Sequence, residues 1–286
     1  MEKEILGFNY ETNGDGELNI KINPVIKKKE PQYLFKYLPL NEYTICCIEK
    51  SYFYLSSPNN FNDPFDCYRE ILGDKFIKED DYYHFLFQKI GIVSMTNNGR
   101  HVLMWAHYCN NEGITLKFKT EYLKSLMTGV FYMNYQRRIP DLSKYDMDIR
   151  FIAALNIKSL KWRYESEWRL IKEKNGLMKS DIPVYDNMAS SSGINLLDRR
   201  QDFDLKQLLE VTLGFKFITK EIFTKKENKI QLKIENKLKI KLLDYLIQKD
   251  IYTQIIDFGN ITEFKLRKVR CKIEKIDDGE YLILLI

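Results

Sequence analysis

Strand-like and helix-like segments alternate along the chain from residue 33 onward, and this alternation limits the fold to a mixed class. "YLFKYL" at 33–38 is β-prone, "EYTICCIEK" at 42–50 has the spacing of a short helix, and "SYFYLSSP" at 51–58 has the ring-rich character of a buried strand that stops at a proline. The sequence therefore predicts an α+β fold that begins with a strand, a helix and a second strand.

The same reading extends over the rest of the chain. Helices are expected at 79–90, 101–113, 148–161 and 219–250, and strands at 91–96, 114–119, 165–172 and 208–214. From residue 262 the pattern alternates and turns at Asp278-Gly279, which predicts a β-hairpin. We divide the chain into an N-terminal extension (1–30), a central domain (31–218) and a basic helical segment with a C-terminal hairpin (219–286).

Composition excludes several classes of protein. The hydrophobic fraction of 44% with 30% charged residues is that of a globular chain, and no segment has the length of a signal peptide core or a membrane span. Five cysteines without a CxxC pair and only three histidines give no zinc pattern. We expect a cytoplasmic protein with reduced thiols, no membrane association and no metal.

One stretch, "KWRYESEWRLIKE" at 161–173, places acidic side chains at every second position. In a strand Glu165, Glu167 and Arg169 share one face, while Trp168 and Leu170 lie on the other. Two interpretations are open. Arg169 neutralises the carboxylates as a structural ion pair, or the carboxylates point into a functional site.

Two further stretches supply candidates for such a site. In "LSSPNNFNDPFDC" the short polar residues Ser56, Ser57, Asn62 and Asp63 surround Phe61 and Phe65, which suits a planar ligand that carries a sugar, although a capped turn gives the same composition. "MWAHYC" adds His107 and Tyr108 on one helical turn, where a packing role is the alternative to a site role.

These motifs carry a family resemblance. "FKYL", "LSSPNNFNDPFDC", "MWAHYCNNEGITLKF" and "LKWRYESEWRLI" occur in an order that resembles the bacterial family called domain of unknown function 2971, over residues 33–215. A Glu-x-Glu strand late in a mixed domain, after a serine-containing strand, also resembles the ADP-ribosyltransferase superfamily. That resemblance implies a split mixed β-sheet core flanked by helices, here followed by the C-terminal helix and hairpin.

The second resemblance implies an activity and assigns residues to it. Glu167 matches the carboxylate that stabilises the ribosyl cation formed from NAD, and Glu165 matches the carboxylate that assists the acceptor. Ser56 or Ser57 matches the serine of the middle strand. The first-strand position falls near Lys36 or Tyr37, where the superfamily has Arg or His. Asn62, Asp63, Phe65, His107, Tyr108 and Arg169 complete the expected NAD site, with no metal.

The expected function is therefore NAD-dependent ADP-ribosylation of a macromolecule, in a toxin of a toxin–antitoxin or phage-defence system. Residues 216–250 hold ten lysines and five acidic residues, so the net charge of this segment equals the formal net charge of +5 of the whole chain. Since phosphates attract such a segment, nucleic acid, RNA in particular, is favoured over protein as the acceptor. An antitoxin or chaperone is a further expected partner.

Two alternatives belong to other classes. A metal-dependent nuclease would use Asp63, Asp66, Glu165 and Glu167 as oxygen ligands for magnesium, but the sequence offers no catalytic lysine close to them. A non-enzymatic recognition module would use the same motifs for packing and its C-terminal third for a partner.

Overall fold

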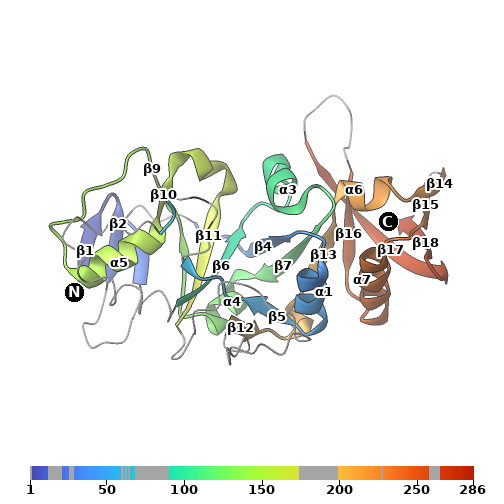
Figure 1. Ribbon diagram of the computed structural model, residues 1–286, viewed down its shortest axis with the longest axis horizontal. Coiled ribbons are helices and arrows are strands. Elements are labelled where there is room, and N and C mark those ends of the chain that lie inside the picture. Colours follow the sequence, from blue (N-terminus) through green and yellow to red (C-terminus); the bar gives the residue numbers. More distant parts are fainter. Residues whose placement is uncertain are drawn as a thin grey trace, which may run out of the picture. The chain divides into compact units, whose positions relative to one another are not determined.

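The computed structural model describes residues 2–11, 21–25, 29–58, 61, 63, 65–67, 90–173, 199–226, 228–257 and 265–286 (Figure 1). Residues 79–89 of the predicted helix at 79–90 lie outside this part of the chain. The fold is α+β, as predicted, and includes a large mixed sheet with helices packed on it.

Two compact units make up the molecule, and the chain passes repeatedly between them. Unit 1 contains Met1–Gln32, Phe53–Met95 and Thr120–Gln201, and unit 2 contains Tyr33–Tyr52, Thr96–Lys119 and Asp202–Ile286. The predicted division at residues 30 and 218 follows the chain in order, whereas these units interleave along it. The predicted domains stay a prediction.

Unit 1 has strands in four groups. A meander joins β1 (Glu2–Ile5), β2 (Phe8–Glu11) and β3 (Lys21–Pro24). A second group consists of β6 (Ile90–Thr96), β11 (Glu167–Glu173) and β8 (Gly129–Tyr132), in that order. In a third group β9 (Asn134–Gln136) pairs in parallel with β10 (Ile157–Ser159). β5 (Tyr52–Tyr54) pairs with β12 (Arg200–Asp202). Its helices are α4 (Thr120–Leu126), α5 (Met147–Asn156) and the 3-10 helix η4 (Leu160–Glu165).

The N-terminal residues, expected as an extension, contribute to the core of unit 1. Tyr10 on β2 is completely buried, and its hydroxyl donates to Asn156 Oδ1 at the end of α5 over 2.8 Å. Ile5, Phe8 and Ile22 join the same hydrophobic cluster as the buried side chains of α5. Each such side chain contributes about 1.5–3 kcal/mol when it leaves water, so these strands stabilise unit 1.

Unit 2 contains a long mixed sheet in the order β14-β15-β18-β17-β16-β13-β7-β4. The strands are β4 (Tyr33–Leu38), β7 (Ile114–Lys119), β13 (Glu210–Leu213), β14 (Ile222–Lys226), β15 (Lys229–Lys233), β16 (Thr253–Asp257), β17 (Arg267–Asp277) and β18 (Glu280–Leu285). The helices are α1 (Glu42–Glu49), α3 (Val102–Cys109), η6 (Leu205–Gln207), α6 (Phe215–Thr219) and α7 (Lys237–Gln248). α1 and α7 lie side by side (Figure 1).

Local signals explain several of these elements. The side chain of Asn41 accepts a hydrogen bond from Thr44 N at the start of α1, and that of Asn236 caps α7 in the same way. The predicted hairpin turn is confirmed, because Gly279 joins β17 to β18 with φ of +73°. The helix expected to end at Gly113 ends earlier, at Cys109, since Asn110 adopts the left-handed conformation.

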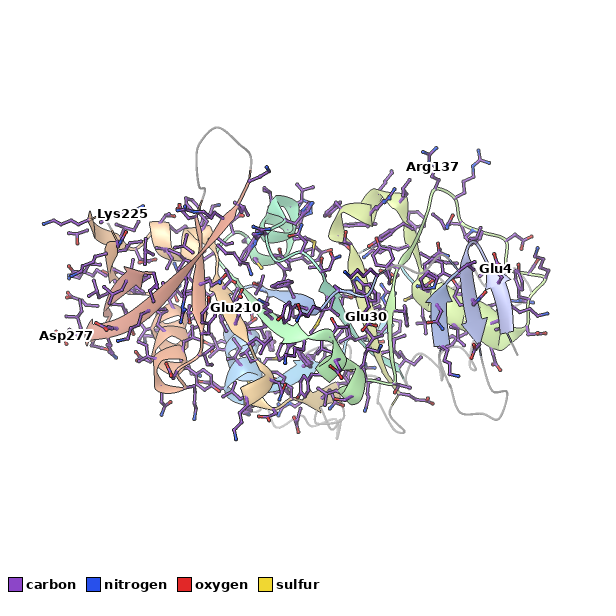
Figure 2. The ribbon with its side chains drawn as sticks, turned by 180° about the vertical axis from the view of Figure 1, so that it is seen from behind. Glu4, Glu30, Arg137, Glu210, Lys225 and Asp277 are labelled. Carbon is purple, nitrogen blue, oxygen red and sulfur yellow. The ribbon has the colours of Figure 1, made fainter. Side chains whose placement is uncertain are left out.

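The helix predicted for residues 219–250 is wrong for its first half. Residues 222–226 and 229–233 form the antiparallel strands β14 and β15, and a helix begins only at Lys237. The reason lies in "KIQLK", where Ile230 and Leu232 are buried while Lys229 and Lys233 are exposed, a period of two. Lys225 on β14 extends outward (Figure 2). Among the described residues, no helix is long and apolar enough to cross a membrane.

Candidate functional site

Three consecutive elements of unit 1 bring the predicted carboxylates together. β10 supplies Lys158, η4 ends at Glu165, and β11 begins at Glu167. The expectation that Glu165 and Glu167 belong to one strand is wrong, because Ser166 between them has φ of 45° and donates its backbone N–H to Arg163 O, which closes a 3-10 turn. The two carboxylates nevertheless converge, since a lysine lies between them.

That lysine, Lys158, is the centre of the site. Its Nζ lies 2.6 Å from Glu165 Oε2, 2.8 Å from Glu167 Oε2 and 3.5 Å from Asp66 Oδ2. Its side chain is 6% exposed, and the ammonium lies 5.4 Å from the centre of the Trp162 ring. One buried ammonium therefore holds three carboxylates.

Arg169, on the same strand as Glu167, supplies the second cation. The Nη2 group donates to both oxygens of Asp66 at 3.0 and 2.9 Å and to Glu167 Oε1 at 3.2 Å. Nη1 donates to the carbonyl of Leu155 at 2.7 Å, and the Phe61 ring lies 4.8 Å from the guanidinium carbon. Arg169 is fully buried and directs its donors to protein acceptors, so its role is to hold the carboxylates in place.

We call Asp66, Lys158, Glu165, Glu167 and Arg169 the Lys158 cluster. Burial raises the pKa of Glu167, but Arg169 and Lys158 outweigh it and hold this pKa well below its ordinary value. Burial lowers the pKa of Lys158, but Glu167, Asp66 and Glu165 outweigh it and raise this pKa. With all five groups charged, three carboxylates face two cations, and the cluster keeps one negative charge in excess.

Hydrogen bonds from neighbouring elements fix Glu167 further. The hydroxyl of Ser94 on β6 bonds to its carboxylate, and its backbone N–H donates to Tyr135 Oη over 2.8 Å. Burial and the charge of Glu167 raise the pKa of Tyr135, so its hydroxyl keeps its proton. The position of Glu167 is therefore determined by β6, β9 and β10 together.

A pocket of about 230 Å³ opens beside the cluster within unit 1. Lys158 and Ile157 belong to its lining, and Arg137, Arg138 and Lys161 add exposed cations. Phe65, half exposed, supplies a ring, and Figure 2 shows Arg137 extending outward. A pocket with cations and one ring at a carboxylate cluster suits a ligand that carries phosphate and a planar group.

The predicted loop reaches the cluster, with separate roles for its residues. The carboxylate of Asp66 accepts hydrogen bonds from Arg169, and the ring of Phe61 lies against the Arg169 guanidinium. Asp63 is buried, and its Oδ1 accepts from Phe65 N over 3.0 Å, so it caps the turn. Asn62 lies outside the described residues.

The predicted serines, Ser56 and Ser57, lie between β5 and this loop. Ser56 forms an isolated bridge with Ile92 of β6, and Ser57 is buried. The hydroxyl that bonds to Glu167 belongs to Ser94, two residues further along β6. Ser94 was missed because a single serine in "GIVSMT" resembles an ordinary strand residue.

Four predicted site residues belong to unit 2. Tyr37 on β4 packs its ring on Trp105, and its hydroxyl donates to Asn98 O over 2.9 Å, so it acts in packing. Lys36 is partly exposed on the same strand. On α3, His107 is exposed and Tyr108 is partly exposed. The other described candidates, with the Lys158 cluster, belong to unit 1.

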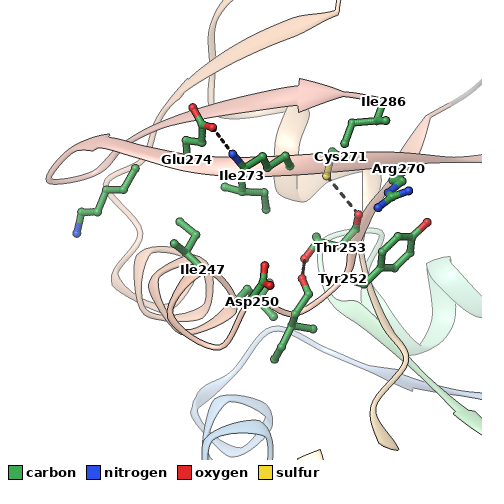
Figure 3. A pocket seen from close by; sticks show the side chains of 13 residues that line it. Ile247, Asp250, Tyr252, Thr253, Arg270, Cys271, Ile273, Glu274 and Ile286 are labelled. Atoms are coloured by element: carbon green, nitrogen blue, oxygen red, sulfur yellow. Dashed lines mark hydrogen bonds and ion pairs between the residues drawn. The ribbon is translucent and has the colours of Figure 1, made fainter. Parts of the chain in front are cut away.

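A wider pocket, of about 690 Å³, lies in unit 2 between the end of α7 and β17 (Figure 3). Its lining includes none of the predicted site residues. Cys271 in its wall is buried, donates to the carbonyl of Thr253 and has a pKa raised to about 12 by burial, so it is an unreactive thiol. We place the candidate site at the Lys158 cluster because charge and geometry converge there.

Lys158 is the main residue that the sequence analysis missed. Its only local signal is a charged residue at the end of the apolar run "FIAALNIK", and it reaches Glu165 and Glu167 from seven and nine positions away. In the described ranges no group of three or more His, Cys, Asp or Glu residues is placed to hold a metal ion, and the ammonium of Lys158 lies between the carboxylates.

Comparison with known families covers part of this site. Residues 104–170 match the model of a family described as a protein of unknown function (DUF2971). This match supports the first predicted resemblance and spans α3 through the start of β11, including Lys158, Glu165 and Glu167. No curated protein and no solved structure matches the chain.

Proposed function

We propose that this protein is an NAD-dependent ADP-ribosyltransferase that modifies a macromolecule. The observation that carries the proposal is the convergence of Glu165 and Glu167 on Lys158, beside a pocket lined by cations. Glu167 is the residue that stabilises the transition state, and Glu165 serves the acceptor. The DUF2971 match includes both residues but conveys no activity.

The charge balance of the cluster supports these roles. When the bond between the ribose C1′ and the nicotinamide nitrogen breaks, nicotinamide leaves with the electron pair and positive charge develops on the ribose. A site with one excess negative charge in a water-poor environment stabilises that charge more than bulk water does. The nucleophilic atom of the acceptor then bonds to C1′, and Glu165 takes its proton.

Lys158 and Arg169 have positioning roles in this scheme. They hold Glu167 ionised, because without them burial would favour its protonated acid. Arg137, Arg138 and Lys161 at the pocket rim suit the diphosphate of NAD, and Phe65 suits a stacked ring.

The test measures release of nicotinamide from NAD and transfer of labelled ADP-ribose to RNA and protein fractions. Glu167→Gln removes the charge and keeps the shape, so both activities are expected to fall by about 100-fold or more. Glu165→Gln is expected to lose transfer and to keep part of the nicotinamide release. The matched control is Glu173→Gln, at the far end of the same strand. Parental activity in Glu167→Gln would overturn the proposal.

A biological readout follows from the same variants. An enzyme of this kind acts as the toxin of a toxin–antitoxin or phage-defence system, because unrestrained modification of a macromolecule stops growth. Induced expression of the parent in bacteria is expected to arrest growth, and expression of Glu167→Gln at an equal protein level is not. Equal arrest by both would contradict the toxin role.

A metal-dependent nuclease is the second candidate, and Lys158 favours it. The sequence argument against this class was the lack of a nearby lysine, yet Lys158 contacts Asp66, Glu165 and Glu167. Carboxylate oxygens are ligands that magnesium accepts, although Lys158 would have to move aside. Cleavage of RNA or DNA that depends on magnesium, stops with a chelator and is lost in Glu165→Gln would favour this reading over NAD chemistry.

A further inference from the structure

One face of the unit 2 sheet combines aromatic rings with cations. Tyr33 and Phe35 of β4 lie beside Lys119 and Lys117 of β7 in the strand register. Lys268 and Arg270 come from β17, and Tyr252 directly precedes β16. We call these seven residues the basic aromatic face.

The strand register and contacts between these side chains together place them on one side of the sheet. The Lys117 ammonium lies 4.4 Å from the centre of the Tyr33 ring, and the Lys268 ammonium lies 4.5 Å from that of Phe35. The Arg270 guanidinium carbon lies 5.0 Å from the centre of the Tyr252 ring. Three cations therefore each lie against a ring, the arrangement of a cation–π pair.

The carboxylate of Glu210 on β13, labelled in Figure 2, lies beside this face, since Glu210 is opposite Lys117 in the strand register. Lys268 Nζ is 2.7 Å from Glu210 Oε1, and Lys117 Nζ is 3.3 Å from Glu210 Oε2. The face holds four cations, two of which share this carboxylate, so positive charge is in excess. Lys119 and Arg270 are exposed, and Tyr252 is 37% exposed, so two cations and one ring are accessible. Tyr33 and Phe35, in contrast, are partly exposed, and Gly99 packs against Phe35 and Lys268.

We propose that the basic aromatic face binds single-stranded nucleic acid. Cations along a sheet attract phosphates, and ring faces beside them stack with bases that are not paired. β4, β7, β13, β16 and β17 are neighbours about 4.8 Å apart, so the face extends over about 19 Å, enough for a short stretch of single strand. An acidic peptide would use the charges but would leave the rings without stacking partners.

This inference names the acceptor class for the proposed function and rests on it for its biological meaning. It also relocates the expected phosphate contacts. The sequence analysis expected them on one helix of the lysine-rich segment, but Lys225, Lys226, Lys229 and Lys233 lie on the antiparallel strands β14 and β15. The cation–ring pairs described above belong to the basic aromatic face.

The test uses the full chain and fluorescence anisotropy with short labelled oligonucleotides of mixed sequence, as single-stranded RNA, single-stranded DNA and duplex DNA. NAD is absent, so failure to bind differs from failure of the proposed activity. We expect the single strands to bind more tightly than the duplex. Failure of both single strands to bind, or equal binding of the duplex, would overturn the proposal and favour a protein acceptor.

Variants separate the face from a general effect of charge. Lys119→Gln with Arg270→Gln is expected to weaken binding about tenfold and to reduce the salt slope by about 1.4, measured between about 50 and about 200 mM salt. Lys225→Gln with Lys226→Gln removes the same charge from β14 and is expected to change affinity less than about twofold. Equal weakening by both pairs would overturn the assignment.

A separate variant tests whether an aromatic ring of this face stacks with bases. Tyr252→Leu keeps an apolar side chain at a partly exposed position and is expected to weaken binding of single strands about tenfold without a change in the salt slope. Circular dichroism checks that the variant is folded. Unchanged affinity in a folded Tyr252→Leu protein would contradict the stacking role.

Discussion

The Lys158 cluster in unit 1 and the Glu210 group in unit 2 are built from the same kinds of side chain in opposite proportion. In the first, three carboxylates face two cations, and every member is at most 7% exposed. In the second, one carboxylate faces two lysines, of which Lys117 is 24% and Lys268 12% exposed. The sign of the excess charge and its access to water therefore differ.

The difference teaches what each group can do. An excess of buried carboxylate stabilises a positive charge that develops nearby, which is the basis of the proposed chemistry. An excess of cations at an accessible face attracts anions from solution, which is the basis of the proposed binding surface. The pKa directions follow the number of carboxylates, since burial outweighs Glu210 and lowers the pKa of Lys268, whereas three carboxylates outweigh burial and raise the pKa of Lys158.

The largest effect is expected on stability, when one cation is removed from each group. Arg169→Met leaves Asp66 and Glu167 buried with too little positive charge, and unit 1 is expected to lose about 3–5 kcal/mol of stability. Lys268→Met leaves Glu210 bonded to Lys117 and Thr212, so unit 2 is expected to lose about 1–2 kcal/mol. Hydrogen exchange with mass spectrometry reads each unit separately. Equal losses would break the comparison.

A smaller effect concerns acid. Because the folded pKa of Glu167 is depressed, its contribution to stability is present above the unfolded pKa of about 4.3 and is lost as pH falls toward the folded value. Between about pH 5 and about pH 3 the unfolding free energy is expected to drop by about 2 kcal/mol on this account. Urea unfolding across this range should show a flatter profile in Glu167→Gln.

Glu210 serves as the internal comparison for that experiment. Its pKa is also lowered, as Lys268 and the hydrogen bonds outweigh burial, so the sign is the same. Its partners Lys117 and Lys268 are more exposed than Lys158 and Arg169, and we expect Glu210→Gln to flatten the profile less than Glu167→Gln does. A steeper change from Glu210→Gln would reverse the order of the two groups.

The smallest expected effect belongs to the edge of the basic aromatic face. Lys119 is exposed at the end of β7, so Lys119→Gln is expected to change the unfolding free energy by less than about 0.5 kcal/mol. Oligonucleotide affinity is expected to fall about threefold in the same protein, as one phosphate contact is lost. Paired unfolding and anisotropy measurements on one preparation sharpen the distinction between a stabilising and a binding cation.

Much of the fold follows from local patterns in the sequence. The strand at 33–38, the helix that begins at Glu42 and the turn at Gly279 have signals within a few residues, and the structure confirms them. The strand pair at 222–226 and 229–233 was missed because its lysines mask a period of two carried only by Ile230 and Leu232. The helix was predicted from the high lysine content of the segment, whereas the burial of alternate residues on β15 determines its strand structure.

The site was predictable only in part for a similar reason. Glu165 and Glu167 were found because they are close in sequence, but Lys158 and Asp66 join them through tertiary contacts that no local pattern encodes. The turn at Ser166 also depends on these contacts, since a left-handed serine is unfavourable without a surrounding structure that holds it. Lys158, rather than a shared strand face, brings the two carboxylates together.

The interleaving of the two units has a consequence for synthesis on the ribosome. Unit 1 needs residues up to Gln201, yet residues 33–52 and 96–119 of unit 2 emerge before it is complete. β4 and β7 in these segments pair with each other, but the other edge of β7 must wait for β13, which comes from the last third of the chain. A nascent chain of this kind exposes strand edges until translation ends, so its yield of native protein depends on elongation rate and on chaperones that cover those edges.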